Sequence, residues 1–209
     1  MRPLACCLVA VAVLFALAAR PPAVAISDWT LLKNAAVRRD LRLTAEQQEE
    51  VDVILRKIET PSPRRTADPP ANGPGATDFV LQERAISEAV IANSYRQLHA
   101  ILSERQRRRL WQINAQASGS AVFDDSHVQR VLQLTADQRR QMEALSEKLL
   151  NDALAAVIDT DPTFAEVFSL AHAVTQKSYE GSLALLTTQQ REDLDQLLGE
   201  RFDLKLLRE

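Results

Sequence analysis

The sequence predicts an all-α protein built as a tandem repeat of two four-helix units, with an elongated architecture of helical hairpins. Three observations predict this fold class. Helix-forming residues dominate, and only 5 glycines interrupt the 209 residues. A helix-starting motif occurs four times along the chain. No segment sustains the alternation of apolar and polar residues that is typical of a strand, so we predict no sheet.

The recurring motif consists of leucine, then threonine or serine, then two further residues and glutamine. The hydroxyl oxygen can accept a hydrogen bond from the third helical N–H, while the glutamine side chain reaches back to the N–H of the hydroxyl residue. Such a capping box starts a helix. The capping residues predicted in this way are Leu43, Thr44 and Gln47; Leu102, Ser103 and Gln106; Leu134, Thr135 and Gln138; and Leu186, Thr187 and Gln190.

The spacing of the four boxes indicates an internal duplication. The first and third boxes are 91 residues apart and the second and fourth are 84 apart, and a shift of 84 places Tyr95 on Tyr179. We therefore predict two helical units, residues 26–118 and 119–209. The spacing is longer in the first unit because residues 59–77 hold five of the nine prolines and form a linker rather than a helix.

Each unit is expected to contain four helices. In the first unit they cover residues 28–41, 45–58 and 78–101, and the segment after Ser103. In the second they cover residues 124–132, 136–157 and 163–185, and the segment after Thr187. Apolar residues spaced three to five apart give the long helices an apolar face.

Residues 1–25 have the form of a secretory signal peptide. A basic start precedes an apolar run from Leu4 to Ala19, and Ala23-Val24-Ala25 provides a cleavage site. The alternative is a retained membrane anchor, although the apolar run is shorter than the ~20 residues of a typical span. Cleavage would remove Cys6 and Cys7, so the mature protein would have no disulfide, and we expect it to be periplasmic or secreted.

The composition of the mature chain argues against several functions. Cleavage removes Arg2 and Arg20 from the 25 basic residues and leaves all 28 acidic ones, a net charge of −5 that does not favour nucleic-acid binding. The sequence has no Gly-x-Ser-x-Gly elbow and no glycine-rich phosphate loop, so we predict neither an enzyme nor a cofactor.

No metal site is predicted either. His99, His127 and His172 are each alone in their segments. Asp124 lies three residues before His127 and could form a weak divalent site with it, but an exposed or capping histidine is the simpler interpretation.

Residues that could bind a partner molecule lie on the long helices and on a basic run. Apolar candidates are Val90, Tyr95, Phe168 and Tyr179, and Arg105 and Arg108 could form a charged rim near Trp111. The simpler interpretation places the aromatic side chains in the core and the arginines on a solvated helix face. An apolar helix stripe has the same sequence pattern in both cases.

At its four Leu-[Thr/Ser]-x-x-Gln boxes the chain resembles the Spy/CpxP family of exported helical proteins of the bacterial periplasm. The resemblance implies a thin, cradle-shaped antiparallel dimer that acts as an ATP-independent chaperone or as a metal-sensing modulator of envelope stress. Family members have two boxes per chain, whereas this chain has four. It is similar in this respect to double-length exported proteins that end in a Gly and Phe motif, here Leu197-Leu198-Gly199-Glu200-Arg201-Phe202.

From this resemblance we expect a periplasmic, chaperone-type protein whose partners are unfolded or partly folded exported proteins. A homodimer remains open, because a single chain with four boxes could also mimic the family dimer. No stable membrane insertion is expected after cleavage of the signal. The alternatives are a metal-responsive sensor and a structural interaction domain. The scarcity of histidine, methionine and cysteine argues against the sensor.

Overall fold

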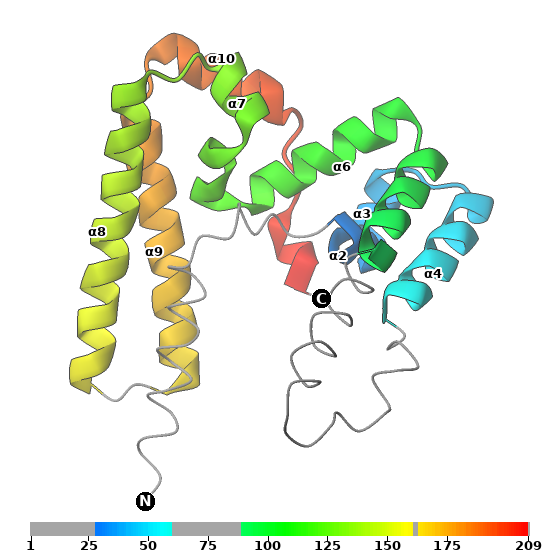
Figure 1. The fold of residues 1–209 in the computed structure, drawn as a ribbon, viewed down its shortest axis with the longest axis horizontal. Helices are drawn as coiled ribbons and strands as arrows, with labels where there is room; N and C mark the ends of the chain where they lie inside the picture. The colour runs from blue at the N-terminus through cyan, green and yellow to red at the C-terminus, as the bar shows by residue number, and fades with distance from the viewer. Residues whose placement is uncertain (1–27, 60–88, 161–162, 209) are drawn as a thin grey trace, which may run out of the picture. The chain divides into compact units, whose positions relative to one another are not determined.

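The structure is a computed structural model and describes residues 28–59, 89–160 and 163–208. All regular elements in these ranges are helical and none is a strand, which confirms the predicted all-α class (Figure 1). The predicted signal peptide, residues 60–77 of the predicted linker and residues 78–88 of the predicted helix over 78–101 lie outside the described residues. Glu59, which was predicted to start the linker, is helical instead.

The described residues divide into two compact units. The first unit comprises residues 28–59, 89–111 and 203–208, and the second comprises residues 112–160 and 163–202. Helix α6 (Glu104–Ala117) passes from the first unit into the second between Trp111 and Gln112. The chain returns to the first unit after Phe202.

The first unit begins with two short helices, α2 (Asp28–Lys33) and α3 (Ala35–Asp40), followed by α4 (Ala45–Glu59). Residues 89–101 are helical, the start of α6 follows, and the 3₁₀ helix η3 (Leu204–Arg208) completes the unit. The predicted continuous helix over residues 28–41 is wrong. Asn34 interrupts it because its side-chain oxygen accepts from the N–H groups of Ala36 (2.8 Å) and Val37 (3.2 Å), and so starts a new helix.

The second unit contains the end of α6, the 3₁₀ helix η2 (Gly119–Asp124), α7 (Ser126–Val131), α8 (Ala136–Thr160), α9 (Phe164–Ala184) and α10 (Thr188–Leu198). The predicted helix over residues 124–132 is corrected in the same way as the first. Asp125 accepts from the N–H groups of His127 and Val128, so α7 begins after it and a 3₁₀ turn precedes it.

Helices α8 and α9 form an antiparallel hairpin with closely packed axes (Figure 1). Gly181 makes this approach possible, because a Cβ atom at its position would overlap the side chain of Leu145. The hydroxyls of Ser146 and Ser178 form a hydrogen bond of 2.7 Å across the interface. Nearer the tip, Val157 and Val167 are buried, and half-buried leucines pack against them: Leu150, Leu154 and Leu170.

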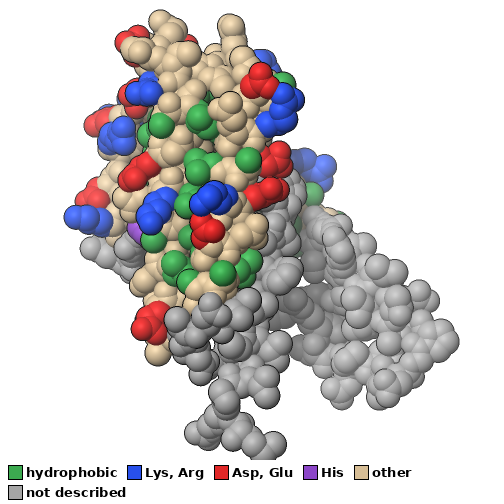
Figure 2. Space-filling view, turned by 90° about the vertical axis from the view of Figure 1, so that its left-hand side faces the viewer, with side chains coloured by type: hydrophobic (Ala, Val, Ile, Leu, Met, Phe, Trp, Pro, Cys, Tyr) green, Lys and Arg blue, Asp and Glu red, His purple; other side chains and the backbone are tan. Residues whose placement is uncertain are grey.

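One face of this hairpin combines apolar and charged side chains. Figure 2 views the molecule from the side on which α8 lies, and it shows hydrophobic side chains gathered between Lys, Arg, Asp and Glu side chains.

Each unit also has an apolar core of its own. The fully buried side chains include Leu32, Val37, Val51 and Leu98 in the first unit, and Ile113, Val128, Leu132 and Leu194 in the second.

Candidate functional site

All four boxes contain both hydrogen bonds of a capping box. The hydroxyl oxygens of Thr44, Ser103, Thr135 and Thr187 accept from the N–H of the glutamine three residues later, at 3.1–3.3 Å. Each glutamine oxygen in turn accepts from the N–H of the hydroxyl residue, at 2.9–3.1 Å. These bonds satisfy N–H groups at the start of a helix that have no partner within it.

The two boxes of the first unit are joined to each other through their glutamines. Gln47 Nε2 donates to Gln106 Oε1 and Gln106 Nε2 donates to Gln47 Oε1, both at 3.0 Å. The remaining N–H of Gln47 bonds the carbonyl oxygen of Ile101 (2.9 Å), and that of Gln106 bonds the carbonyl oxygen of Leu41 (3.2 Å). We call this group of four residues the first clamp.

The second unit contains the same arrangement. Gln138 and Gln190 exchange hydrogen bonds of 2.8 and 3.1 Å through their amides. Gln138 also donates to the carbonyl oxygen of Leu185, and Gln190 donates to that of Leu132, both at 3.0 Å. We call these four residues the second clamp.

Each clamp satisfies its two glutamine amides completely. A glutamine side chain has two N–H donors and an oxygen with two lone pairs, and all four positions are used. Each glutamine lies at the start of one helix and bonds the end of the helix that precedes its partner's helix. In the first unit, Gln47 of α4 bonds Ile101, which lies before α6, and Gln106 of α6 bonds Leu41, which lies before α4. Neutral, fully satisfied amides offer no acid, base or nucleophile, so the role of the clamp is to hold the helices together.

The leucines of the boxes belong to the core. Leu43, Leu102, Leu134 and Leu186 are all buried. The first box of each unit is preceded by a non-glycine residue of positive φ, namely Arg42 (φ 52°) and Gln133 (φ 50°). This left-handed residue ends the preceding helix and redirects the chain so that the leucine packs inward.

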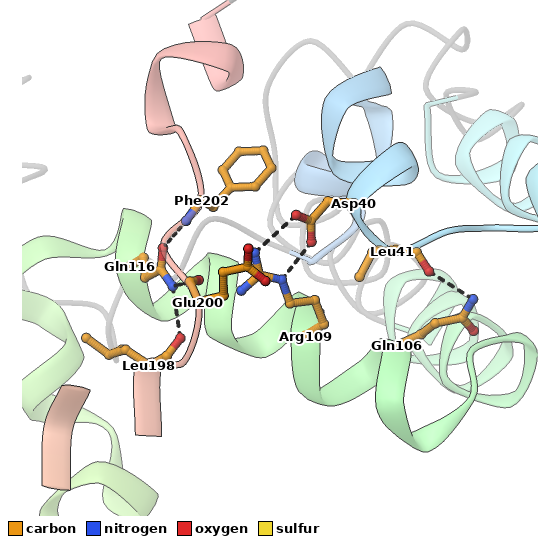
Figure 3. Close-up of polar contacts among 8 residues, drawn as sticks. All are labelled: Asp40, Leu41, Gln106, Arg109, Gln116, Leu198, Glu200 and Phe202. Carbon is orange, nitrogen blue, oxygen red and sulfur yellow. Dashed lines mark hydrogen bonds and ion pairs between the residues drawn. The ribbon is translucent and has the colours of Figure 1, made fainter. Parts of the chain in front are cut away.

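The surroundings of the two clamps differ in charge. In the first unit, Arg109 binds the Asp40 carboxylate with two hydrogen bonds, Nε–Oδ2 at 2.6 Å and Nη2–Oδ1 at 3.1 Å, beside the bond from Gln106 to Leu41 (Figure 3). At the equivalent positions the second unit has Val131 and Asp193, which cannot form an ion pair.

Sequence reasoning missed two side-chain amides that hold the C-terminal segment. In the second unit, Gln116 donates to the carbonyls of Leu198 (2.9 Å) and Glu200 (2.8 Å) and accepts from the N–H of Phe202 (2.8 Å) (Figure 3). In the first unit, Asn34 donates to the carbonyl of Leu206 (2.7 Å). These contacts join residues more than 80 positions apart, so no local pattern indicates them.

The six predicted client-binding residues do not lie together in one unit. Val90, Arg105 and Arg108 are exposed and Tyr95 is half-buried, all in the first unit. Tyr179 belongs to the second unit, where its ring stacks on buried Phe123 with centroids 5.8 Å apart. Burial raises the pKa of the Tyr179 hydroxyl above its ordinary value. The side chain of Phe168 lies outside the described part of the structure.

The three histidines belong to different segments and all are exposed. Within residues 28–59, 89–160 and 163–208, no group of three or more His, Cys, Asp or Glu side chains could hold a metal ion. None of the helices in the same ranges is both long and apolar enough to span a membrane.

Comparison with known proteins gave no match: no family model, no curated protein and no solved structure is significantly similar to this chain. The described chain is an all-helical protein in which paired capping boxes clamp the helix ends of each unit.

Proposed function

We propose that this chain is an exported binding protein of chaperone type, which holds partly unfolded clients on apolar helical surfaces without ATP. The resemblance of its boxes to those of the Spy/CpxP family and the signal-like residues 1–25 support export and this type of activity. The sequence also has no glycine-rich phosphate loop, which fits an activity that is independent of nucleotide.

The main structural support comes from the exposed apolar residues of the first unit. Val90 and Ile91 are consecutive residues on the helix 89–101, and 40% and 38% of their surfaces are exposed. Val53, at 41%, lies on α4 beside that helix, and Gln47 near the start of α4 contacts Ile101 at the end of the other helix (Figure 1). Three of the five large exposed hydrophobic residues among those described therefore belong to this one hairpin.

The α8–α9 hairpin of the second unit offers a similar surface. Its leucines Leu149, Leu150, Leu154 and Leu170 are only half-buried, and Figure 2 shows apolar side chains bordered by charged ones on this hairpin. Contact with any apolar segment lowers the free energy of an apolar strip of this kind, because the hydrophobic effect is not directional. The charged border keeps the free protein in solution.

The test is suppression of aggregation of a reduced, unfolding client such as insulin, followed by light scattering with and without ATP. We expect the protein to slow aggregation equally in both cases. The V90S/I91S variant should suppress it less well. The matched control is L204S, because Leu204 is as exposed as Ile91, at 38%, but lies in η3 rather than in the hairpin.

Two outcomes would contradict the proposal. If several-fold molar excess of the folded protein has no effect on aggregation, the chain is not a chaperone of this type and a structural interaction domain becomes the better hypothesis. If divalent metal ions raise the melting temperature and are required for activity, the metal-responsive alternative gains support.

A further inference from the structure

The first clamp is surrounded by arginines that the clamp itself does not use. Arg42, Arg105 and Arg108 are exposed, and none of their guanidinium groups has a hydrogen bond or ion pair to a residue that the structure describes. Gln106 bonds the carbonyl of Leu41. Arg105 directly precedes Gln106 and Arg42 directly follows Leu41, so this bond brings the two arginines to the same part of the first unit. Arg108 lies one helical turn after Arg105 and shares its side of α6.

The second clamp shows that the fold does not require these arginines. Its equivalent residues are Gln133, Gln189 and Glu192, yet it forms the same set of hydrogen bonds. Position 133 even has the same left-handed backbone as position 42, with φ of 50° and 52°. The backbone is therefore common to both clamps, and the choice of arginine in the first one needs a different explanation.

The contrast extends to nine charged positions around the clamps, but not to the two residues after the glutamine of the first box, where Arg139 and Arg140 of the second unit replace Gln48 and Glu49 of the first. Nine positions of the first unit contain six arginines and three acids, whereas the nine equivalent positions of the second contain two arginines and three acids. These positions are 39, 40, 42, 46, 104, 105, 107, 108 and 109 in the first unit, and 130, 131, 133, 137, 188, 189, 191, 192 and 193 in the second. With positions 48 and 49 and their equivalents included, the first clamp has six arginines and four acids, and the second has four arginines and three acids. The clamps thus differ in where their arginines lie more than in net charge, and we call the arginines of the first clamp its basic patch.

Three arginines of the patch already have partners. Arg109 is paired with Asp40, Arg107 donates to the carbonyls of His99 and Leu102, and Arg39 donates to the carbonyl of Ala35 (3.4 Å). The positive charge available to a ligand therefore comes from Arg42, Arg105 and Arg108. Guanidinium groups favour carboxylates and phosphates, which they can bind with two parallel hydrogen bonds.

We propose that Arg42, Arg105 and Arg108 form a docking site for an acidic segment of a client polypeptide. The inference rests on the proposed function and adds to it the chemistry of the client and the unit that recruits it. Glu46 and Glu104 are exposed among these arginines. They would repel a continuous anionic surface such as a membrane, whereas a flexible peptide can place single carboxylates beside the arginines and away from the glutamates.

The test exchanges residues between the two clamps. In R42Q/R105Q/R108E the first clamp receives the side chains of the second, and in Q133R/Q189R/E192R the second receives those of the first. Binding of a labelled oligo-glutamate peptide is measured by fluorescence anisotropy. We expect the first variant to bind about tenfold more weakly, the size expected from the loss of three exposed ion pairs. The second variant should bind two peptides per chain instead of one.

Wild-type binding should also weaken steeply in about 0.5 M salt, because exposed charges are screened over a few ångströms at that ionic strength. Circular dichroism checks that each variant is folded, and if the first variant unfolds, the stoichiometry of the second still decides. Unchanged peptide affinity in the folded first variant, or a single site in the second, overturns the proposal. So does an arginine-dependent affinity for phosphatidylglycerol vesicles without affinity for the peptide.

This outcome can be separated from that of the proposed function. Suppression of insulin aggregation in about 0.5 M salt depends on apolar contact and should persist in R42Q/R105Q/R108E. Loss of peptide binding with retained suppression supports both proposals. Peptide binding without any suppression would leave the acidic docking site in place and overturn the chaperone activity.

Discussion

The two clamps share their hydrogen bonds, their buried leucines and the left-handed residue before the first box, and they differ in the charged residues around them. In both, two glutamines exchange amide hydrogen bonds and cap the helices that follow. Around the first clamp, Arg109 is paired with Asp40 and further arginines are exposed, while the second has Val131 and Asp193 at the paired positions. The comparison indicates that the clamp does not depend on the charged residues around it. These residues can therefore have a different role in each unit.

The hairpins beside the clamps differ as well. The position of Gly181 in α9 corresponds to Gln97 in the first unit, and that of Ser146 in α8 corresponds to Leu55. Small residues therefore bring α8 and α9 close together, while larger side chains stand at the matching positions of α4 and the helix 89–101. The second hairpin gains its stability from close backbone approach, which makes it sensitive to added volume.

The largest expected effect comes from breaking a clamp. Gln47→Ala and Gln138→Ala each remove a cap and the bonds to the partner glutamine and to a main-chain carbonyl. We expect each to lower the free energy of unfolding by about 2–3 kcal/mol. Chemical denaturation measures the effect. A clearly smaller loss for one of the two would show that the clamps are not energetically equivalent.

A double-mutant cycle sharpens this test. Gln138 and Gln190 satisfy each other, so the second substitution removes less than the first. The loss in Q138A/Q190A should fall short of the sum of the two single losses by at least about 0.5 kcal/mol. Additive losses would mean that each glutamine acts as an independent cap and that the amide pair contributes nothing.

The next effect concerns the close approach of α8 and α9. Gly181→Ala places a methyl group against the side chain of Leu145. We expect a net loss of about 1–2 kcal/mol, although alanine alone would favour the helix by about 1 kcal/mol. In an L145A background the same change should cost nothing or stabilise the protein. Thermal unfolding of the wild type, the two single variants and the double variant measures this. An equal loss in both backgrounds would mean that packing against Leu145 is not the cause.

A smaller effect is expected from the ion pair of the first clamp. Asp40 and Arg109 pair at the protein surface, with side chains 28% and 16% exposed, and Asp40→Ala should cost about 0.5–1 kcal/mol. V131D/D193R transfers the pair to the second unit and should recover about 0.5 kcal/mol there. The measurement is the unfolding midpoint in low and high salt. An effect that does not change with salt would argue against an electrostatic origin.

The helices and caps could be predicted from the sequence because a capping box is complete within four residues. The helix predicted over residues 163–185 from its apolar spacing also matches α9, which begins after Thr163 and ends before Leu185. Other features needed contacts that are distant in sequence. Gln47 and Gln106 are 59 residues apart, and nothing in either box indicates that one amide will find the other.

The helix starts at Asn34 and Asp125 could have been predicted from the local sequence but were not. Asn34 and Asp125 occupy equivalent positions, and each interrupts a helical pattern by capping the residues after it. The apolar periodicity continues through both positions and so hides the interruption.

The burial of the tyrosines could not be predicted from the sequence. Tyr95 and Tyr179 align in the sequence and are both half-buried, but only the structure reveals that Phe123 takes up one face of Tyr179.

The smallest expected effect separates the four glutamine boxes from a fifth box that the sequence analysis overlooked. Thr163 starts α9 with Glu166 in the place of glutamine, and its N–H and hydroxyl both donate to Glu166 Oε2 at 2.7 Å. The hydroxyl bond, and then the backbone bond, lower the pKa of Glu166 below its ordinary 4.5.

Because the folded-state pKa of Glu166 is depressed, this cap stabilises the protein at a pH above the unfolded-state pKa. The stabilisation is lost as the pH falls through the folded-state pKa. Glutamine does not titrate, so the boxes at Thr135 and Thr187 should keep their caps over the same range. The N–H of Thr163 donates to Glu166, so its NMR shift should move between about pH 6 and pH 3, and Glu166→Gln should remove most of the movement. The N–H of Thr187 donates to Gln190 and has no acidic residue within four positions in the sequence, so its shift should stay nearly constant. Equal shifts at both sites would instead point to a general acid transition of the second unit.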